Sequence, residues 1–331
     1  NEDDFDIFAL HKKIGDDQLL VSVCANVFLQ YNFISSLGVS IPKLIQYFRA
    51  LQSHYKTSNP YHCGMHAADV LQTTNVYLCC GDVKENFSDV ELIAVLFSAM
   101  VHDIAHPGIS NAFLTAVNHP LAKLFNDTSV LESMHTSLAF ILLERADCNF
   151  FSSSTTWQKY HADDFRSLVI QVVTGTDMKH HSAMIKSVED ILDDGQIDDD
   201  EVAQLFKAIV HAADLSNSMK DLPVYINWME RVNAEFWQQG DEERRRGMTI
   251  SMMCDRNNTF ISKSQCGFIE FVVLPYMQKL APVLPPVWLS RLEDNLKFMK
   301  ELTTDQENTI KRRIKRPASK PWADDSTHPF S

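Results

Sequence analysis

The sequence has few basic residues and no long apolar run. Lysine and arginine number 30 against 43 aspartates and glutamates, so the formal net charge of the 331-residue chain is −13. A nucleic-acid interface requires a basic face, and this balance therefore argues against nucleic acid as a partner. No apolar run approaches the ~18 residues that cross a bilayer, and no signal peptide precedes the first expected helix. We therefore expect no membrane contact by this chain itself.

Paired cysteine motifs are absent as well. The seven cysteines are odd in number and none is spaced as Cys-x2-Cys, which favours a reduced, intracellular chain in the cytoplasm. The chain begins at Asn1 without a methionine. We expect it to have been cut from a longer protein, whose regulatory or membrane-targeting domains would lie outside this sequence. The sequence leaves the oligomeric state open.

No long polar linker divides the chain before residue 300, so we expect one large domain over residues 1 to 302. With 45% hydrophobic and 22% charged residues, it has the composition of a soluble globular protein. Residues 303 to 331 turn polar and contain one basic run, Lys311 to Arg316. This segment is predicted to be a tail, disordered in part. A linker is favoured for the basic run over a localisation signal.

Apolar residues recur at helical spacing, and no alternating strand pattern is found. The expected helices are two between residues 17 and 52 joined by a turn at Gly38, one from Pro60 with Asn59 as its cap, and others over 92–100, 130–144, 163–173, the stretch that leads to Asp214, 224–239, 265–271 and 286–301. The sequence therefore predicts an all-α fold. Residues 190 to 201 partly imitate a calcium-binding loop, but Leu192 supplies no oxygen, which favours an acidic connector.

Potential metal ligands follow the apolar run 92–100. If the helix continues, His106 lies one turn beyond His102 and Asp103, so that imidazoles and a carboxylate share one side. Such groups are costly to bury at the end of an apolar helix unless a cation binds them. Three further pairs stand at helical spacing: His62 with His66, Glu132 with His135, and His211 with Asp214. Each pair alone has a structural explanation, and their joint occurrence predicts a metal site.

Together these motifs resemble the catalytic domain of class I cyclic-nucleotide phosphodiesterases, within the wider HD-type metal phosphohydrolases. The matching motifs are His-Asp-x2-His-x4-Asn from His102 to Asn111, Asn-Pro-Tyr-His-x3-His-Ala-Ala-Asp at 59–69, Thr-Asp-Met at 176–178, Ala-Asp-Leu-Ser-Asn at 213–217 and Ser-Gln-x-Gly-Phe-Ile at 264–269. The resemblance covers about residues 40 to 300 and is closest to the cAMP-specific branch. It implies a compact multi-helix domain with a metal cleft at converging helix ends.

The resemblance implies a zinc ion with the ligands His66, His102, Asp103 and Asp214, and a second metal that Asp103 bridges. Two imidazoles and two carboxylates suit Zn²⁺, and a site with one carboxylate and several waters suits Mg²⁺, with Mn²⁺ as the alternative. Two metal ions about 3.5 to 4 Å apart can share a hydroxide that attacks phosphorus. The resemblance also implies an outer shell around the metals. His106, Glu132 and Thr176 would hold metal-bound waters, and His135 would face the phosphate.

By the same resemblance, His62 is the general acid that protonates the departing 3′ oxygen, and Glu235 orients and charges its ring. The implied reaction is hydrolysis of a 3′,5′-cyclic nucleotide to the 5′-monophosphate, with cAMP favoured over cGMP. The resemblance also implies that Gln265 binds the purine between Phe268 and Val232. This is consistent with helical geometry, because residues three apart on a helix can present an amide edge and an aromatic face to one base. The other implied substrate contacts are Tyr61, Met178, Asn217, Phe236 and Met253.

Three departures from the commonest family pattern are Cys63 for asparagine, Ala105 for aspartate, and Ser133-Met134 for Asn-His. None of them removes an expected ligand or the acid. Two other functions remain open: a regulatory module that binds cyclic nucleotide without turnover, and an HD-type phosphohydrolase that acts on other nucleotides. The presence of His62 and of every ligand argues against the first. The pairing of Gln265 with Phe268 argues against the second.

Overall fold

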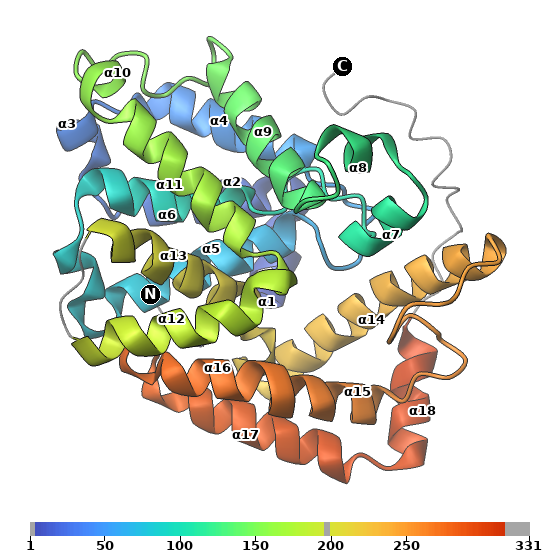
Figure 1. Cartoon of the computed structure of the whole chain (residues 1–331). Coiled ribbons are helices and arrows are strands. Elements are labelled where there is room, and N and C mark those ends of the chain that lie inside the picture. Colours follow the sequence, from blue (N-terminus) through green and yellow to red (C-terminus); the bar gives the residue numbers. More distant parts are fainter. Residues whose placement is uncertain (1–3, 195–198, 315–331) are drawn as a thin grey trace.

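The computed structural model describes residues 4–194 and 199–314, and within these residues it contains helices and no strand, which confirms the all-α prediction (Figure 1). None of the described helices combines the length and the apolar character needed to span a bilayer. The α-helices are α1 (Ile7–Ile14), α2 (Asp16–Phe28), α3 (Phe33–Leu37), α4 (Ile41–His54), α5 (Gly64–Cys79), α6 (Asp89–Val101), α7 (Asn111–Ala116), α8 (Pro120–Leu124), α9 (Val130–Glu144), α10 (Trp157–Tyr160), α11 (Ala162–Gly175), α12 (His181–Asp194), α13 (Asp199–Asp214), α14 (Leu222–Arg245), α15 (Ile261–Phe268), α16 (Leu274–Lys279), α17 (Pro286–Glu301) and α18 (Thr304–Arg313).

Short helical turns connect several of these elements. Four are 3₁₀ turns: η1 (Cys80–Asn86), η2 (Met178–His180), η3 (Ser216–Met219) and η5 (Ala281–Val283). The fifth, η4 (Ile269–Val273), is a π-helical turn that joins α15 to α16. Because η2 follows α11 and η3 follows α13, two of these turns extend helices that lead to expected site residues.

Two buried helices form the centre of the domain. Every residue of α6 from Leu92 to Val101 is buried, and every residue of α5 from Gly64 to Leu78 is buried too. A helix that is covered on all sides belongs in a core, and α5 and α6 pack against each other while α2 covers α5 and α11 covers α6 (Figure 1). At ~1.5–3 kcal/mol for each large apolar side chain, their burial is a major stabilising contribution and fixes the positions of the helix ends.

Two helix boundaries differ from the sequence predictions. The helix expected from Pro60 begins at Gly64, so His62 precedes it. Asn59 does not cap this helix, because its side-chain nitrogen donates to the carbonyl oxygens of His62 and His106. Helix α6 ends at Val101, and Ala105 has a φ of 59°, in the left-handed region, so the chain turns away before His106. The expected metal ligands are therefore brought together by turns at helix ends rather than along one face of a helix.

The C-terminal segment also corrects an expectation. The polar stretch expected to be a tail from residue 303 forms α18, whose N-terminus carries a capping box between Thr303 and Gln306. The buried carboxylate of Glu307 accepts hydrogen bonds from the Ile261 amide and the Ser262 hydroxyl, which attaches α18 to the start of α15. Residues 315 to 331 lie outside the described residues, as do 195 to 198 of the acidic segment that partly imitates a calcium loop.

Candidate metal centre and substrate pocket

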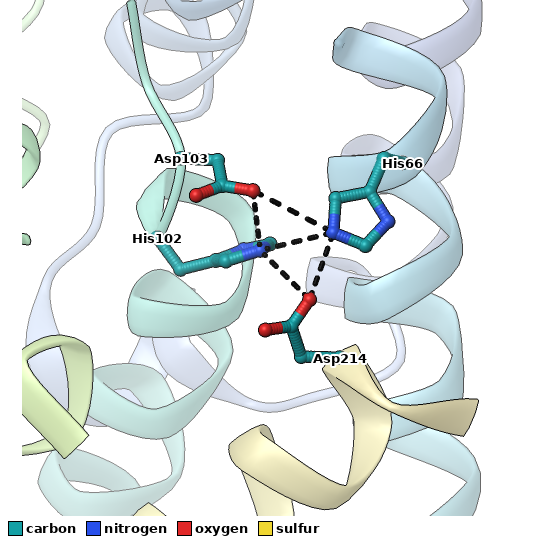
Figure 2. A group of neighbouring side chains, drawn as sticks. All are labelled: His66, His102, Asp103 and Asp214. Atoms are coloured by element: carbon teal, nitrogen blue, oxygen red, sulfur yellow. Dashed lines mark hydrogen bonds and ion pairs between the residues drawn. The ribbon is translucent and has the colours of Figure 1, made fainter. Parts of the chain in front are cut away.

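Four side chains from three separate helix ends meet at one point (Figure 2). His66 projects from the first turn of α5, His102 and Asp103 follow the end of α6, and Asp214 is the last residue of α13. Figure 2 shows the two ring nitrogens and the two carboxylates facing a common centre. This is the ligand set that the sequence predicted, brought together by the ends of core helices.

The four potential ligand atoms lie close enough together to surround a single metal ion. His66 Nε2 lies 2.8 Å from Asp214 Oδ1 and 3.3 Å from His102 Nε2, and His102 Nε2 lies 3.1 Å from Asp103 Oδ2. Ligand atoms ~2.0–2.1 Å from a tetrahedral Zn²⁺ are ~3.3–3.4 Å apart. Burial raises the pKa of Asp214, but the neighbouring His102 and His66 rings outweigh it and hold the pKa well below its ordinary value. The carboxylate is therefore ionised, as a ligand must be.

Backbone carbonyl groups determine which ring nitrogen is protonated in two of the histidines, His102 and His135. His102 Nδ1 lies 2.9 Å from the Ala99 carbonyl oxygen, and His135 Nδ1 lies 2.6 Å from the Ile104 carbonyl oxygen. Because a carbonyl can only accept, each Nδ1 carries a proton. Burial lowers the pKa of His102, but the Asp103 carboxylate outweighs it and raises the pKa well above its ordinary value, so a metal ion at Nε2 would displace a second proton. His102 Nε2 lies close to the ligand atoms of the other three members of the cluster, His66, Asp103 and Asp214.

His135 Nε2 has no hydrogen-bond partner in the described part of the chain, although it is buried. It lies 3.7 Å from Asp103 Oδ1, and burial lowers the pKa of His135 to about 4, so the ring is neutral. A buried nitrogen without a partner is unfavourable unless a further group completes it. This orphaned atom fits a second occupied position beside Asp103.

His106 has the opposite tautomer. Its Nδ1 accepts a hydrogen bond from the Gly108 backbone N–H at 2.9 Å, so Nε2 carries the proton. Burial, together with the neighbouring His62, holds the pKa of His106 well below its usual value, and the ring is neutral. A protonated Nε2 can donate to an oxygen but cannot bind a metal ion. His106 therefore suits contact with the oxygen of a water or a phosphate rather than direct ligation, and its expected contact with a metal-bound water stays a prediction.

Glu132 and Thr176 stand at the start of α9 and the end of α11. The Asn111 amide donates to both Glu132 oxygens, at 3.2 and 2.9 Å, and its own oxygen accepts from the Leu131 N–H at 2.9 Å. Burial raises the pKa of Glu132 to about 7. The Thr176 hydroxyl donates to the Val173 carbonyl at 2.8 Å, which leaves its lone pairs free to accept. Both side chains can thus accept hydrogens from water.

His62 and Glu235 form a paired acid and carboxylate. Glu235 Oε1 is hydrogen-bonded to His62 Nδ1, and Oε2 accepts from the backbone N–H groups of Tyr61 at 2.9 Å and His62 at 3.1 Å. Burial lowers the pKa of His62, but the charges of Glu235 and Asp103 outweigh it and raise the pKa to about 9. The His62 ring stacks on His106 with centroids 4.0 Å apart. A protonated imidazole therefore lies beside the cluster.

A second group of predicted residues adjoins the first. The Asn217 amide donates to the Tyr61 hydroxyl at 2.8 Å, and the Tyr61 ring lies 4.5 Å from the His66 ring. Gln265 is 9% exposed, and its Oε1 accepts from the Tyr225 hydroxyl at 3.0 Å. Tyr225 was missed by the sequence reasoning, because no motif links it to a glutamine 40 positions away.

The remaining predicted contacts are less closely tied to the cluster. Val232 and Phe236 lie one turn apart on α14, and Phe268 ends α15 three residues after Gln265. Met178 in η2 is 47% exposed, and Met253 lies between α14 and α15 with a φ of 65°. The expected role of these two methionines rests on the family resemblance.

Comparisons with known proteins agree with this arrangement. Residues 61–294 match the family model for 3′5′-cyclic nucleotide phosphodiesterase. The chain is 35% identical over 302 residues to the 3′,5′-cyclic-AMP phosphodiesterase 4C of Mus musculus, covering 88% of this chain and 43% of that protein. It is 33% identical over 318 residues to the probable 3′,5′-cyclic-AMP phosphodiesterase pde-4 of Caenorhabditis elegans, covering 92% and 46%. The chain thus spans about half the length of the curated relatives it matches.

Solved structures are similar as well. The phosphodiesterase domain of the rhodopsin phosphodiesterase of Salpingoeca rosetta superposes with a TM-score of 0.81 at 28% identity, over 94% of both chains. A structure of the phosphodiesterase domain of the RhoPDE fusion protein of the same choanoflagellate gives 0.79 at 28% identity, over 89% of this chain and 93% of that chain. By its family model, its relatives and its fold, this chain belongs to the 3′5′-cyclic nucleotide phosphodiesterase family.

Proposed function

We propose that this chain hydrolyses 3′,5′-cyclic nucleotides to 5′-monophosphates, with cAMP preferred over cGMP. The observation that carries the proposal is the protonated His62 beside a four-residue ligand cluster, because it combines an acid for the leaving oxygen with a cation site for the phosphate. The relatives that match the chain are named as cyclic-AMP phosphodiesterases, which supports cAMP as the preferred substrate.

The proposed cofactors are Zn²⁺ at His66, His102, Asp103 and Asp214, and Mg²⁺ or Mn²⁺ at a position beside Asp103. The imidazole and carboxylate donor set suits the first ion, and the orphaned His135 nitrogen supports a second occupied position. When bound, the two ions would activate a water for attack on phosphorus and neutralise the phosphate charge. The charge of the chain supports a role for cations, since a net charge of −13 otherwise repels an anionic substrate.

The proton for the leaving 3′ oxygen is proposed to come from His62. Because Nδ1 is hydrogen-bonded to Glu235, the proton available to substrate is on Nε2. Glu235 is held by two backbone N–H groups, so it can orient the ring and stabilise its positive charge without being displaced. Loss of the proton to the alkoxide leaves a neutral imidazole against the carboxylate, and a proton from solvent restores the acid.

The other expected residues divide into phosphate contacts and purine contacts. His106 can donate from Nε2, while His135, Glu132 and Thr176 can accept hydrogens from ordered water. The adenine edge would meet the Gln265 amide between Phe268 and Val232. The proposed lining of the rest of the pocket is Tyr61, Met178, Asn217, Phe236 and Met253.

We also propose that the chain acts in the cytoplasm on free nucleotide, with neither nucleic acid nor membrane as a partner. The decisive experiment is a turnover assay of the purified chain with cAMP, cGMP and a nucleoside 5′-monophosphate as substrates. We expect 5′-AMP from cAMP, slower release of 5′-GMP from cGMP, and no phosphate release from the monophosphate. Binding of cAMP without turnover would favour a regulatory module, and phosphate release from the monophosphate would favour a general phosphohydrolase.

A further inference from the structure

Lys220 and Asp69 form a buried ion pair outside the ligand set. Lys220 Nζ lies 2.9 Å from Asp69 Oδ1 and donates to Thr73 Oγ1 at 2.8 Å. Each of the two charged residues is 4% exposed. Removing two charges from water is unfavourable, and their mutual attraction often does no more than offset this cost. The stability of the fold is therefore a poor explanation for this pair.

The pair joins two segments that carry site residues. Asp69 lies on α5 one turn after His66, and Lys220 lies six residues after Asp214, directly behind η3. Asp214 Oδ1 approaches His66 Nε2 at 2.8 Å. The segment from Asp214 to Lys220 is thus attached to α5 at both of its ends, by two contacts that are one helical turn apart.

A second helix holds the same segment. The Asn295 amide on α17 donates to the carbonyl oxygens of Ser218 and Lys220, at 2.8 and 2.9 Å. The Lys220 ammonium also lies 5.3 Å from the centre of the Trp288 ring on the same helix. Both the side chain and the backbone of Lys220 are therefore fixed, which makes it the point where α5, η3 and α17 are joined.

We infer that the Lys220–Asp69 pair is a positioning device for the metal centre and the purine pocket. By fixing where the η3 segment crosses α5, it sets the approach of Asp214 to His66 and the direction in which Asn217 reaches Tyr61. The inference rests on the proposed function, because it requires that Asp214 and His66 bind a metal ion. Directionality is the reason for an ionic pair here, since charge-assisted hydrogen bonds fix a geometry and apolar contacts do not.

The test measures Zn²⁺ affinity of the purified chain by competition with a chromophoric chelator. The variant is the double substitution Asp69→Leu with Lys220→Met, which leaves neither charge unpaired, so the melting temperature should stay close to that of the parent. We expect Zn²⁺ affinity to fall about 10- to 100-fold, as happens when groups that orient metal ligands are lost. Lys279→Met is the control, because it removes an exposed ion pair with Glu189 and should change neither quantity.

Parent-like melting and parent-like Zn²⁺ affinity in the double variant would overturn the inference. If that variant does not fold, Lys220→Arg takes its place, because the planar guanidinium keeps the charge but changes the geometry. We expect Lys220→Arg to fold and to bind Zn²⁺ more weakly, and an unchanged affinity would again contradict the inference. Absence of Zn²⁺ binding by the parent chain would overturn the proposed metal centre itself, so the two failures are distinguishable.

Discussion

The hydroxyl of Tyr225 donates a hydrogen bond to Oε1 of Gln265, at 3.0 Å. This contact turns the amide oxygen toward Tyr225, and in the proposed purine pocket it would direct how the amide meets the base. Adenine and guanine present opposite donor and acceptor patterns at the six-position edge, so an amide held one way favours one of them. If Gln265 binds the base as proposed, the choice of base would depend on a residue of α14 that lies outside every motif on which the family resemblance rests.

Tyr225→Phe should reduce the discrimination between cAMP and cGMP. The substitution keeps the ring and removes only the hydrogen bond to Gln265, so the amide becomes free to turn. An unpaired buried polar group costs ~1–3 kcal/mol, which corresponds to about 5- to 150-fold in discrimination. We expect the ratio of kcat/KM for the two substrates to shrink by at least several-fold. A ratio that stays at its parent value would mean that other contacts orient the amide.

Two companion variants define the scale of this effect. Gln265→Ala should weaken both substrates and narrow the gap between them, because neither base can then pair with the amide. Asn217→Ala should relax the preference toward cGMP, since it frees the Tyr61 hydroxyl that Asn217 now holds. Equal efficiency for both substrates in the parent chain would contradict the proposed cAMP preference while leaving the reaction class intact.

His62→Ala should lower turnover by roughly 10²- to 10⁴-fold, the usual contribution of a positioned proton donor. The zinc content should remain that of the parent, because His62 is not among the four ligands. Steady-state kinetics and metal analysis on the same preparation provide the measurement. If turnover survived while a metal was lost, the roles of acid and ligand would have to be exchanged.

Glu235→Gln should move the alkaline limb of the pH profile. His62 acts in its protonated form and its pKa is raised to about 9, so the rate should fall as the pH rises through that region. Removing the charge of Glu235 lowers the pKa of His62, and the fall in rate should therefore begin at a lower pH. A kcat/KM profile of parent and variant across neutral and alkaline pH tests this. An identical limb in both proteins would assign it to another group.

Asp214→Ala should abolish zinc binding and, with it, hydrolysis. Ligands that bind the folded state alone raise its stability, so adding Zn²⁺ to the metal-stripped parent should raise the melting temperature. The variant lacks one of the four ligands and should show little such rise. Differential scanning calorimetry with and without Zn²⁺ makes the comparison independent of activity. Normal hydrolysis by fully metal-stripped parent protein would contradict the proposed mechanism.

Asn59→Ala should destabilise the chain and impair catalysis together. The Asn59 amide links the carbonyl oxygens of His62 and His106, and its loss leaves two buried acceptors without this donor. We expect a loss of about 2 kcal/mol or more in the free energy of unfolding, measured by urea denaturation, and a lower kcat. Asn59→Asp is the matched variant, because it keeps the shape but cannot donate when ionised. Parent-like stability and kcat in both variants would contradict this role.

The parts of the fold that the sequence predicted well are those governed by apolar periodicity. The pattern over 92–100 identified α6, and α17 begins and ends where the pattern indicated. Helix boundaries were harder, because tertiary contacts use residues that look like local signals. Asn59 resembles a helix cap but binds two distant carbonyls, and nothing at Ala105 announces its positive φ. The sequence of residues 304–313 is mostly polar and did not predict a buried helix, yet the buried Glu307 attaches this segment to α15.

For the candidate site, residue types and spacing indicated a metal site, and the family resemblance implied the four residues that cluster and the pairing of His62 with Glu235. Hydrogen-bond partners contributed by the backbone could not be predicted, because a sequence does not show which carbonyl or amide will face a ring. Tyr225 and Lys220 were missed for a related reason: each acts through a side chain that is distant along the chain.

The neighbouring imidazoles of His102, His106 and His135 are chemically identical, yet their backbone partners differ. Nδ1 is a hydrogen-bond donor in His102 and His135 and an acceptor in His106. Carbonyl oxygens occupy one nitrogen of His102 and His135, and an amide hydrogen occupies one nitrogen of His106. Before any ion or nucleotide arrives, His135 therefore presents a lone pair at Nε2 and His106 presents a proton. Burial lowers the pKa of His102, but Asp103 and Asp214 outweigh it and raise the pKa well above its ordinary value, so His102 Nε2 is still protonated. An ion that binds His102 therefore displaces a proton from this ring, while His106 and His135 keep the tautomers that the backbone sets. A shift of the turn from Asp103 to Gly108 would remove the amide that sets the tautomer of His106, without any substitution.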